Sequence, residues 1–127
     1  MTAPPDPSRD ECLDPRRRIR PPGRDFELEL TPQLASRYAE RPYEPLTSAL
    51  IGTVCRRQEV FVDVGAQVGY FSVLAGRANP ALEIYALEPS SENRHLLQRN
   101  LQHNRLNTAR IVQMSTSDLV GTATFRY

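Results

Sequence analysis

The sequence contains no lysine and no tryptophan. All 16 basic residues are arginine, which excludes a lysine Schiff base and a phosphate-loop lysine. Fifteen acidic residues balance them, and a net charge of +1 gives no field of one sign that would attract nucleic acid or an acidic membrane. We therefore expect neither a nucleic-acid partner nor a membrane partner.

Cysteine is scarce, and long hydrophobic runs are missing. Cys12 and Cys55 lie far apart without CxxC or Cys/His spacing, so neither a disulfide framework nor a zinc site is expected. Cys55 is interpreted as a small apolar residue, although the neighbouring Arg56 and Arg57 could lower the pKa of its thiol. The sequence has no secretory-type apolar N-terminal region and no run of about 18 apolar residues, so the expected location is the cytoplasm.

The first 25 residues differ in composition from the rest. They contain six prolines and eleven charged residues, with almost no large apolar side chain to bury, which predicts a disordered tail over residues 1–25. Arg16–Arg18 with Arg20 could form a nucleic-acid patch. Four nearby acidic residues nearly neutralise this cluster and no aromatic residue interrupts it, so a solvated tail is favoured.

Residues 26–57 are predicted to be helical in two pieces. Thr31 and Pro32 suit a helix cap and first turn, and the prolines of residues 42–45 break the pattern. Leu46, Leu50 and Ile51 are spaced to form one helix face, which we expect to pack on the sheet that follows.

Residues 58–127 alternate between strand and helix patterns, which predicts an α/β domain. Strands separated by helices of this length imply right-handed crossovers and a parallel sheet. The expected strands are residues 59–64, 82–87 and 110–114. The expected helices are 69–78 and one that is capped by Ser90 or Ser91 and ends near residues 104–107, and a turn at 117–121 precedes a terminal strand at 122–127.

A glycine turn follows the first of these strands. The apolar run from Val60 to Val64 is typical of a buried strand, and Gly65 and Gly69 then bound a turn that leads into a helix. Glycine lets a ligand approach the backbone closely, and the first N–H groups of the helix are free donors. This pattern suits a nucleotide-like cofactor.

Polar residues follow all three predicted parallel strands. Asp63 to Gly69, Glu88, and Ser115 to Asp118 are expected at the carboxyl edge of the sheet, where ligands of open α/β sheets bind. Glu88 comes 19 positions after Gly69, which places its carboxylate beside the turn, where it could accept both ribose hydroxyls. Alternatively, Glu88 caps the next helix or pairs with an arginine; ribose binding is favoured.

The turn lacks the G-x-G-x-x-G and GK[ST] motifs that seat diphosphates. It is similar to the first motif of class I S-adenosylmethionine-dependent methyltransferases. The longer pattern resembles the FkbM family over about residues 43–125: it runs from Tyr43-Glu44-Pro45 through VDVGAxxGYFS (62–72), Glu88-Pro89, the Asn93/Asn100/Asn104 helix and Ser117-Asp118.

The FkbM resemblance implies a Rossmann-like class I methyltransferase fold, of which this chain would hold the N-terminal cofactor-binding portion. It also implies a set of contacts to S-adenosylmethionine. The set is Asp63, Gly65, Ala66 and Gly69 at the methionine end, Tyr70 beside the cofactor, Glu88 and Pro89 at the ribose, and Ser115 and Thr116 near the adenine. Ser115-Thr116 departs from the small Ala-Leu pair that is usual in the family.

Other polar and aromatic residues have structural interpretations. Tyr70 and Phe71 are expected to pack, and Tyr70 could also flank the cofactor. The asparagines Asn93, Asn100 and Asn104 fall on nearly one helix face, where hydrogen bonding is favoured over catalysis. His95 and His103 are expected to face solvent, and no metal site is predicted.

Two hypotheses for function remain. The first is the cofactor-binding half of an FkbM-type methyltransferase, which the resemblance implies to methylate a hydroxyl of a small molecule or saccharide. The second is an inactive, truncated remnant or a nucleotide-binding module that transfers nothing. The family's acceptor side comes from later strands, so we nominate no catalytic base, and Asp118 is interpreted as a turn residue. Three strands would leave an exposed sheet edge, which predicts poor solubility or dependence on a partner.

Overall fold

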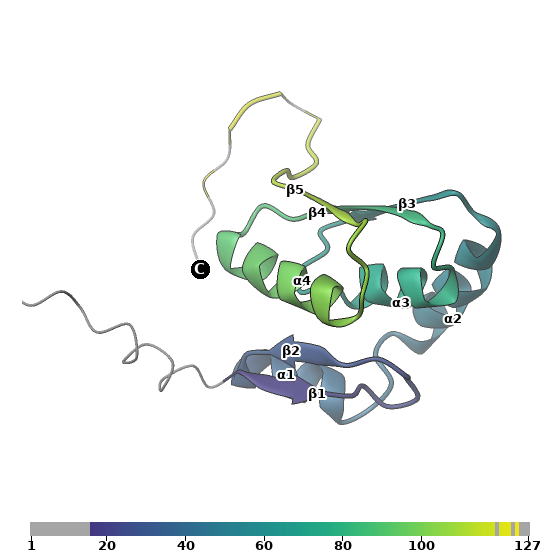
Figure 1. Ribbon diagram of the computed structural model, residues 1–127. Coiled ribbons are helices and arrows are strands. Elements are labelled where there is room, and N and C mark those ends of the chain that lie inside the picture. Colours follow the sequence, from purple (N-terminus) through teal and green to yellow (C-terminus); the bar gives the residue numbers. More distant parts are fainter. Residues whose placement is uncertain (1–15, 119, 123, 125–127) are drawn as a thin grey trace, which may run out of the picture.

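The computed structural model describes residues 16–118, 120–122 and 124. Its elements form three layers: a sheet, two helices beneath it, and a hairpin with a helix beneath those (Figure 1). The sheet contains β3 (Val60–Val64), β4 (Glu83–Leu87) and β5 (Arg110–Val112), and the helices under it are α3 (Tyr70–Ala78) and α4 (Ser91–His103). The third layer contains β1 (Arg17–Ile19), β2 (Leu28–Leu30) and α1 (Pro32–Ala39), and α2 (Pro45–Val54) with the short η2 (Cys55–Arg57) leads to β3.

The main sheet is parallel, in the order β3-β4-β5. Both crossovers are helical, as the alternating pattern predicted. The expected bounds of the strands and helices are correct to within two residues, except that α4 ends at His103 and was expected to end near residues 104–107. The predicted terminal strand at 122–127 cannot be assessed as a whole, because 123 and 125–127 lie outside the described residues.

The predicted helix ends are confirmed. Thr31 is the N-cap of α1 with Pro32 in the first turn, α3 ends before Asn79-Pro80, and α4 begins after Ser90. The Ser90 side chain accepts a hydrogen bond from the backbone N–H of Asn93, which satisfies one of the free donors of the helix start.

The predicted tail over residues 1–25 is wrong where the structure describes it, from residue 16 onwards. Arg17–Ile19 pairs with Leu28–Leu30 in an antiparallel hairpin, so the helical segment expected from residue 26 also begins with a strand. The charged composition suggested a solvated tail, but Arg16, just before β1, and Arg18 in β1 lie 3.6 and 4.0 Å from the Glu29 carboxylate of β2.

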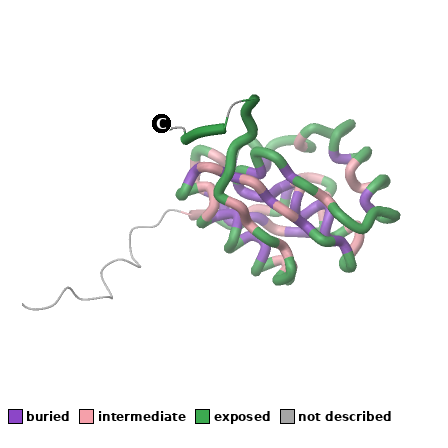
Figure 2. The backbone as a smooth tube through the Cα atoms, turned by 90° about the horizontal axis from the view of Figure 1, so that it is seen from above, coloured by how far each residue is buried: buried purple, intermediate pink, exposed green. Residues whose placement is uncertain are grey.

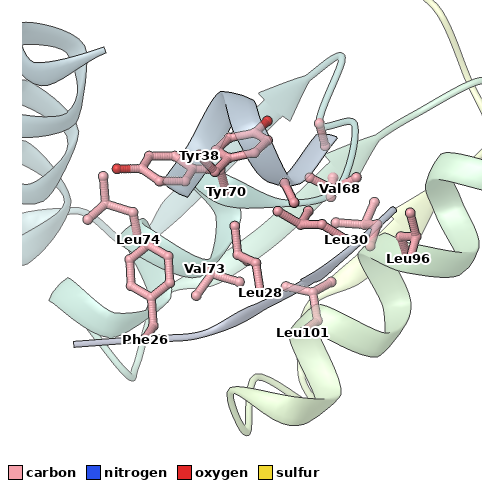
Figure 3. Packing of buried hydrophobic residues seen from close by; sticks show 14 residues of the cluster. Phe26, Leu28, Leu30, Tyr38, Val68, Tyr70, Val73, Leu74, Leu96 and Leu101 are labelled. Atoms are coloured by element: carbon pink, nitrogen blue, oxygen red, sulfur yellow. The ribbon is translucent and has the colours of Figure 1, made fainter. Parts of the chain in front are cut away.

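The main hydrophobic core lies between the two central helices and the hairpin layer. Figure 3 shows Phe26, Leu28 and Leu30 of the hairpin layer against residues of α3 and α4. Leu28 and Leu30 are fully buried, so the hairpin is an integral part of the core.

The other face of the sheet is not covered by any described element. Val60, Val62 and Val64 point to this face and are 49–53% exposed, and they alternate with the more buried Phe61 and Asp63. Seen from above, the backbone carries both exposed and buried stretches (Figure 2). The predicted packing of α2 on the sheet is also wrong for two residues, because Leu46 and Leu50 are exposed and only Ile51 packs on the core. Within the described part of the chain, no helix is both long and apolar enough to span a membrane.

Candidate functional site

The glycine turn joins the end of β3 to the start of α3. Gly65, Gln67 and Gly69 all have positive φ values, of 74°, 49° and 92°, so the backbone alternates between left-handed and ordinary conformations. The amides of Gly65 and Ala66 donate to the carbonyl of Leu87 on β4, and the amide of Gly69 donates to the carbonyl of Ala66. The turn is therefore closed on itself and anchored to the neighbouring strand.

Gly65 and Gly69 are glycines for different reasons. A Cβ at Gly69 would lie 2.6 Å from Leu97 Cδ1, so this position lets α4 pack against the start of α3. A Cβ at Gly65 would meet no atom within 4 Å. The exposed backbone of Gly65 thus faces open space that a ligand could enter.

Asp63, at the end of β3, is 8% exposed and faces the start of α3. Its Oδ2 accepts a hydrogen bond of 2.7 Å from the Ser72 hydroxyl, and its carboxylate also accepts one from the Ser72 backbone N–H. Burial raises the pKa of Asp63, and the two Ser72 bonds oppose this rise without cancelling it. Asp63 therefore caps α3 and leaves a carboxylate under the turn.

Glu88, at the end of β4, is joined to the turn. Its Oε2 accepts the backbone N–H of Gln67 at 2.8 Å, and its Oε1 accepts the backbone N–H of Ser90 at 2.8 Å and Asn93 Nδ2 at 3.4 Å. The helix-capping interpretation of Glu88 is thus confirmed. A carboxylate offers about four acceptor positions, and among the described residues Oε2 accepts one hydrogen bond, so capacity for a hydroxyl remains.

Pro89 follows the end of β4, and Ser115 and Thr116 follow the end of β5. Arg94 Nη1 donates to the carbonyls of Glu88 and Pro89, which orders the start of α4. Ser115 and Thr116 follow β5 in an irregular, exposed segment, and they begin three residues after Val112, whose carbonyl accepts the Glu88 amide. The backbone bond from Glu88 to Val112 thus joins the ends of β4 and β5, and the placing of Ser115 and Thr116 beside a ligand stays a prediction.

The side chain of Tyr70 does not belong to this edge. It is 2% exposed and packs against Phe26, Tyr38, Tyr43 and Phe71, with ring centroids 5.0–5.6 Å apart. Its hydroxyl accepts a 2.9 Å hydrogen bond from Arg24 Nε. The packing interpretation is confirmed, and the expected side-chain contact of Tyr70 with a cofactor is corrected.

The asparagines of α4 have the structural role that their spacing predicted. Asn100 is fully buried with three hydrogen bonds, and Asn104 Nδ2 donates to the carbonyls of Glu27 and Asn100. His95 is exposed, and His103 Nε2 lies 3.4 Å from Glu27. Within residues 16–118, 120–122 and 124, no group of three His, Cys, Asp or Glu side chains could hold a metal ion.

Three participants in the site were not nominated from the sequence. Ser72 binds Asp63, Gln67 binds Glu88 through its backbone, and Asn100 binds the carbonyl of Val68. The position of Ser72 in the first helical turn after the glycines could have indicated its contact with Asp63. A contact made by a backbone N–H, such as that of Gln67, has no signature in the sequence. The interpretation of Cys55 as a small apolar residue is confirmed, because Cys55 is 3% exposed; burial raises the pKa of its thiol, so the alternative of a lowered pKa is wrong.

The chain matches no family model and no curated protein. It is similar to solved methyltransferase structures at low sequence identity. P. horikoshii TYW2 in complex with MeSAdo has a TM-score of 0.63 at 17% identity, over 85% of this chain and 39% of that one. The SAM-dependent methyltransferase from Agrobacterium tumefaciens has a TM-score of 0.59 at 12% sequence identity, and the match covers 82% of this chain and 34% of that one. The tRNA m1G37 methyltransferase of M. jannaschii has a TM-score of 0.51 at 20% sequence identity, and the match covers 82% of this chain and 31% of that one.

This chain spans 31–39% of the length of these proteins. The likeness concerns the fold, because the identities are low. The order of elements, the parallel sheet and the helices under it agree with this assignment. The chain therefore has the α/β, Rossmann-like fold of S-adenosylmethionine-dependent methyltransferases, over the part of that fold that it spans.

Proposed function

We propose that this chain binds S-adenosylmethionine at the Asp63–Gly69 turn and Glu88, as the cofactor-binding part of a methyltransferase. The observation that carries the proposal is the contact of Glu88 Oε2 with the Gln67 backbone N–H at 2.8 Å. This contact joins the ends of two parallel strands, where α/β sheets bind nucleotides, within a fold that known methyltransferases share.

The residues present fit such a cofactor. Gly65 offers an open approach to the backbone, and the carboxylate of Glu88 keeps acceptor capacity on Oε2 for a ribose hydroxyl. We assign Asp63, Gly65, Ala66 and Gly69 to the methionine end, Glu88 and Pro89 to the ribose, and Ser115 and Thr116 to the adenine. Among the residues that the structure describes, no arginine contacts Asp63, so its charge is available to a ligand ammonium group.

When bound, S-adenosylmethionine supplies an electrophilic methyl group, which is released from sulfur as an acceptor oxygen bonds to it. The contribution of this chain is orientation: Glu88 fixes the turn and α4 together, and Asp63 fixes the turn and α3. We assign no group to take the acceptor's proton.

The finer assignment is an FkbM-type O-methyltransferase that acts on a hydroxyl of a small molecule or saccharide, as the sequence resemblance implies. The fold also occurs in a tRNA methyltransferase, so the prediction of no nucleic-acid partner rests on the balanced charge alone. Cytoplasmic location likewise stays a prediction. The alternative function is a nucleotide-binding module without transfer, which would bind the cofactor product but methylate nothing.

Calorimetry with S-adenosylhomocysteine tests the proposal. Glu88→Ala should weaken binding by about 1 to 3 kcal/mol if the carboxylate holds a ribose hydroxyl. Glu92→Ala is the matched control, because Glu92 is an exposed acid in the first turn of the same helix. A folded wild-type protein that releases no heat at millimolar ligand would refute cofactor binding.

A second ligand separates ribose recognition from helix capping. An S-adenosylhomocysteine analogue without the 2′-hydroxyl should bind the wild-type chain more weakly, while the Glu88→Ala variant should bind both ligands alike. Equal discrimination by the two proteins would leave Glu88 with its capping role only.

A further inference from the structure

Asn100 connects three parts of the chain that are distant in sequence. Its Nδ2 donates to the carbonyl of Val68 in the glycine turn at 2.8 Å and to the carbonyl of Glu29 on β2 at 3.1 Å. Its Oδ1 accepts the backbone N–H of Glu29 at 2.6 Å. The side chain is 0% exposed, so these bonds replace water for both of its donors and for its acceptor.

The bond to Val68 fixes one peptide unit of the turn. The carbonyl of Val68 and the amide of Gly69 belong to the same planar peptide, and that amide donates to Ala66 at 2.8 Å. The peptide is thus held at both ends, in opposite directions. Gly69 has a φ of 92°, and rotation of this peptide would change that φ and the direction of the first N–H groups of α3.

We propose that Asn100 is a positioning residue for the cofactor site, acting through the Val68–Gly69 peptide; this rests on the function proposed above. Its two remaining bonds hold β2, so the amide locks the turn to the hairpin layer on the other side of the central helices. The N-terminal hairpin then supports the site without contacting the ligand. Loss of the amide frees this peptide, while Asp63 and Glu88 keep their own hydrogen bonds to Ser72 and Gln67.

Asn104 provides a matched control. It lies one turn further along α4, and its Nδ2 donates to the carbonyl of Glu27 beside the hairpin strand at 2.8 Å and to the carbonyl of Asn100, but not to the turn. Asn104→Ala therefore removes a side-chain tie between α4 and the hairpin layer and leaves the Val68 contact intact. Asn100→Ala removes both kinds of tie.

The first experiment uses no ligand. The chain has six glycines, so their amide signals can be assigned in a ¹⁵N NMR spectrum. Asn100→Ala should shift the Gly69 amide signal and speed its hydrogen exchange by about ten-fold or more, whereas Asn104→Ala should leave both near their wild-type values. An unchanged Gly69 signal in folded Asn100→Ala would overturn the proposal.

The second experiment measures binding of S-adenosylhomocysteine by calorimetry. Asn100→Ala should weaken it about ten-fold or more, and Asn104→Ala should not, even if both lower the free energy of unfolding equally. If wild-type protein binds no ligand, the proposed function fails while the Gly69 comparison still decides the role of Asn100. If Asn100→Ala does not fold, Asn100→Ser takes its place, because serine keeps one donor and one acceptor. If that variant folds and has the Gly69 hydrogen exchange and the affinity of the wild type, the positioning role of Asn100 is refuted.

Discussion

At the scale of the residue, the glycines of the turn carry different constraints. Gly65→Ala puts a Cβ into open space at a φ of 74°, so backbone strain of about 1 to 2 kcal/mol is the expected loss of stability. Gly69→Ala causes similar backbone strain and also a clash of the new methyl group with Leu97 Cδ1. Overpacking of this kind costs about 1 to 3 kcal/mol more. Urea unfolding should rank the two variants in that order.

Gly52 in α2 supplies the control for both substitutions. A Cβ there meets no atom within 4 Å and the φ is ordinary, so Gly52→Ala should be neutral or should stabilise by up to about 1 kcal/mol. Equal losses at Gly65 and Gly69 would contradict the close packing of α4 on the turn. In ligand binding, Gly65→Ala should cause the larger loss of affinity, because only the Gly65 methyl enters the proposed ligand space.

Asp63 predicts a pH dependence of stability. Its pKa is raised above the ordinary value of 3.8 by burial, so the folded chain holds the proton more tightly than the unfolded chain does. The stability contribution of Asp63 is therefore full below pH 3.8 and is lost as the pH rises through its folded pKa. Asp63→Asn does not titrate, and its stability relative to the wild type should rise across this window.

Urea unfolding of both proteins from about pH 4 to about pH 7 measures this difference, since the other carboxylates titrate in both and largely cancel. A difference that stays flat, or that falls with pH, would show that the Ser72 hydrogen bonds outweigh the effect of burial. Ser72→Ala removes both the hydroxyl bond and its pKa-lowering effect, so in that background the change with pH should be steeper.

At the scale of the element, the β1–β2 hairpin belongs to the core. Leu28→Ala should cost about 2 to 5 kcal/mol, as expected for a fully buried leucine. Leu46→Ala is the same chemical change on a residue of α2 that is 86% exposed, and it should change stability by about 0.5 kcal/mol or less. The free energy of unfolding in urea checks both, and similar losses would mean that α2 packs where the structure exposes it.

The α/β elements could be predicted because their local signals agree with the fold. Val60–Val64 is apolar, Asn79-Pro80 cannot continue a helix, and Ser90 is a good cap, so each boundary has a local cause. The hairpin could not be predicted, because its short strands are paired through the backbone and the charges of β1 resemble those of a tail.

The site was predictable to the extent that strand ends determine it. Asp63, Gly65, Gly69 and Glu88 lie at one sheet edge because parallel strands bring their carboxyl ends together. The packing of Tyr70 was predicted, but its partners were not, because these aromatic rings come from residues 26–43, far away in the sequence. The contacts of Asn100 depend likewise on tertiary structure.

At the scale of the whole molecule, the sheet is covered on one face only by the described residues. Val60, Val62 and Val64 lie about half exposed on the bare face, and β3 pairs with β4 alone among the strands of this sheet. Exposed apolar strands with a free edge promote association between chains. We expect the isolated chain to self-associate as its concentration rises.

Val62→Lys should reduce this association in sedimentation experiments while leaving the midpoint of unfolding nearly unchanged, because a charge on an open strand face opposes pairing. Arg110→Lys is the control, because Arg110 already carries a charge on this sheet. It should change neither the association nor the midpoint of unfolding. Association that persists unaltered in the Val62→Lys variant would place the contact on another surface.

The bond between Asn100 and Glu29 spans 71 positions of the sequence, and this separation has a consequence for synthesis on the ribosome. At about 5 to 20 residues per second, roughly 4 to 14 seconds pass between the emergence of β2 and that of its partner in α4. During this interval Leu28 and Leu30 lack the helix that buries them, and the Val68 peptide has no amide to hold it. The nascent hairpin is therefore a candidate for chaperone binding, and the glycine turn is completed only when α4 arrives.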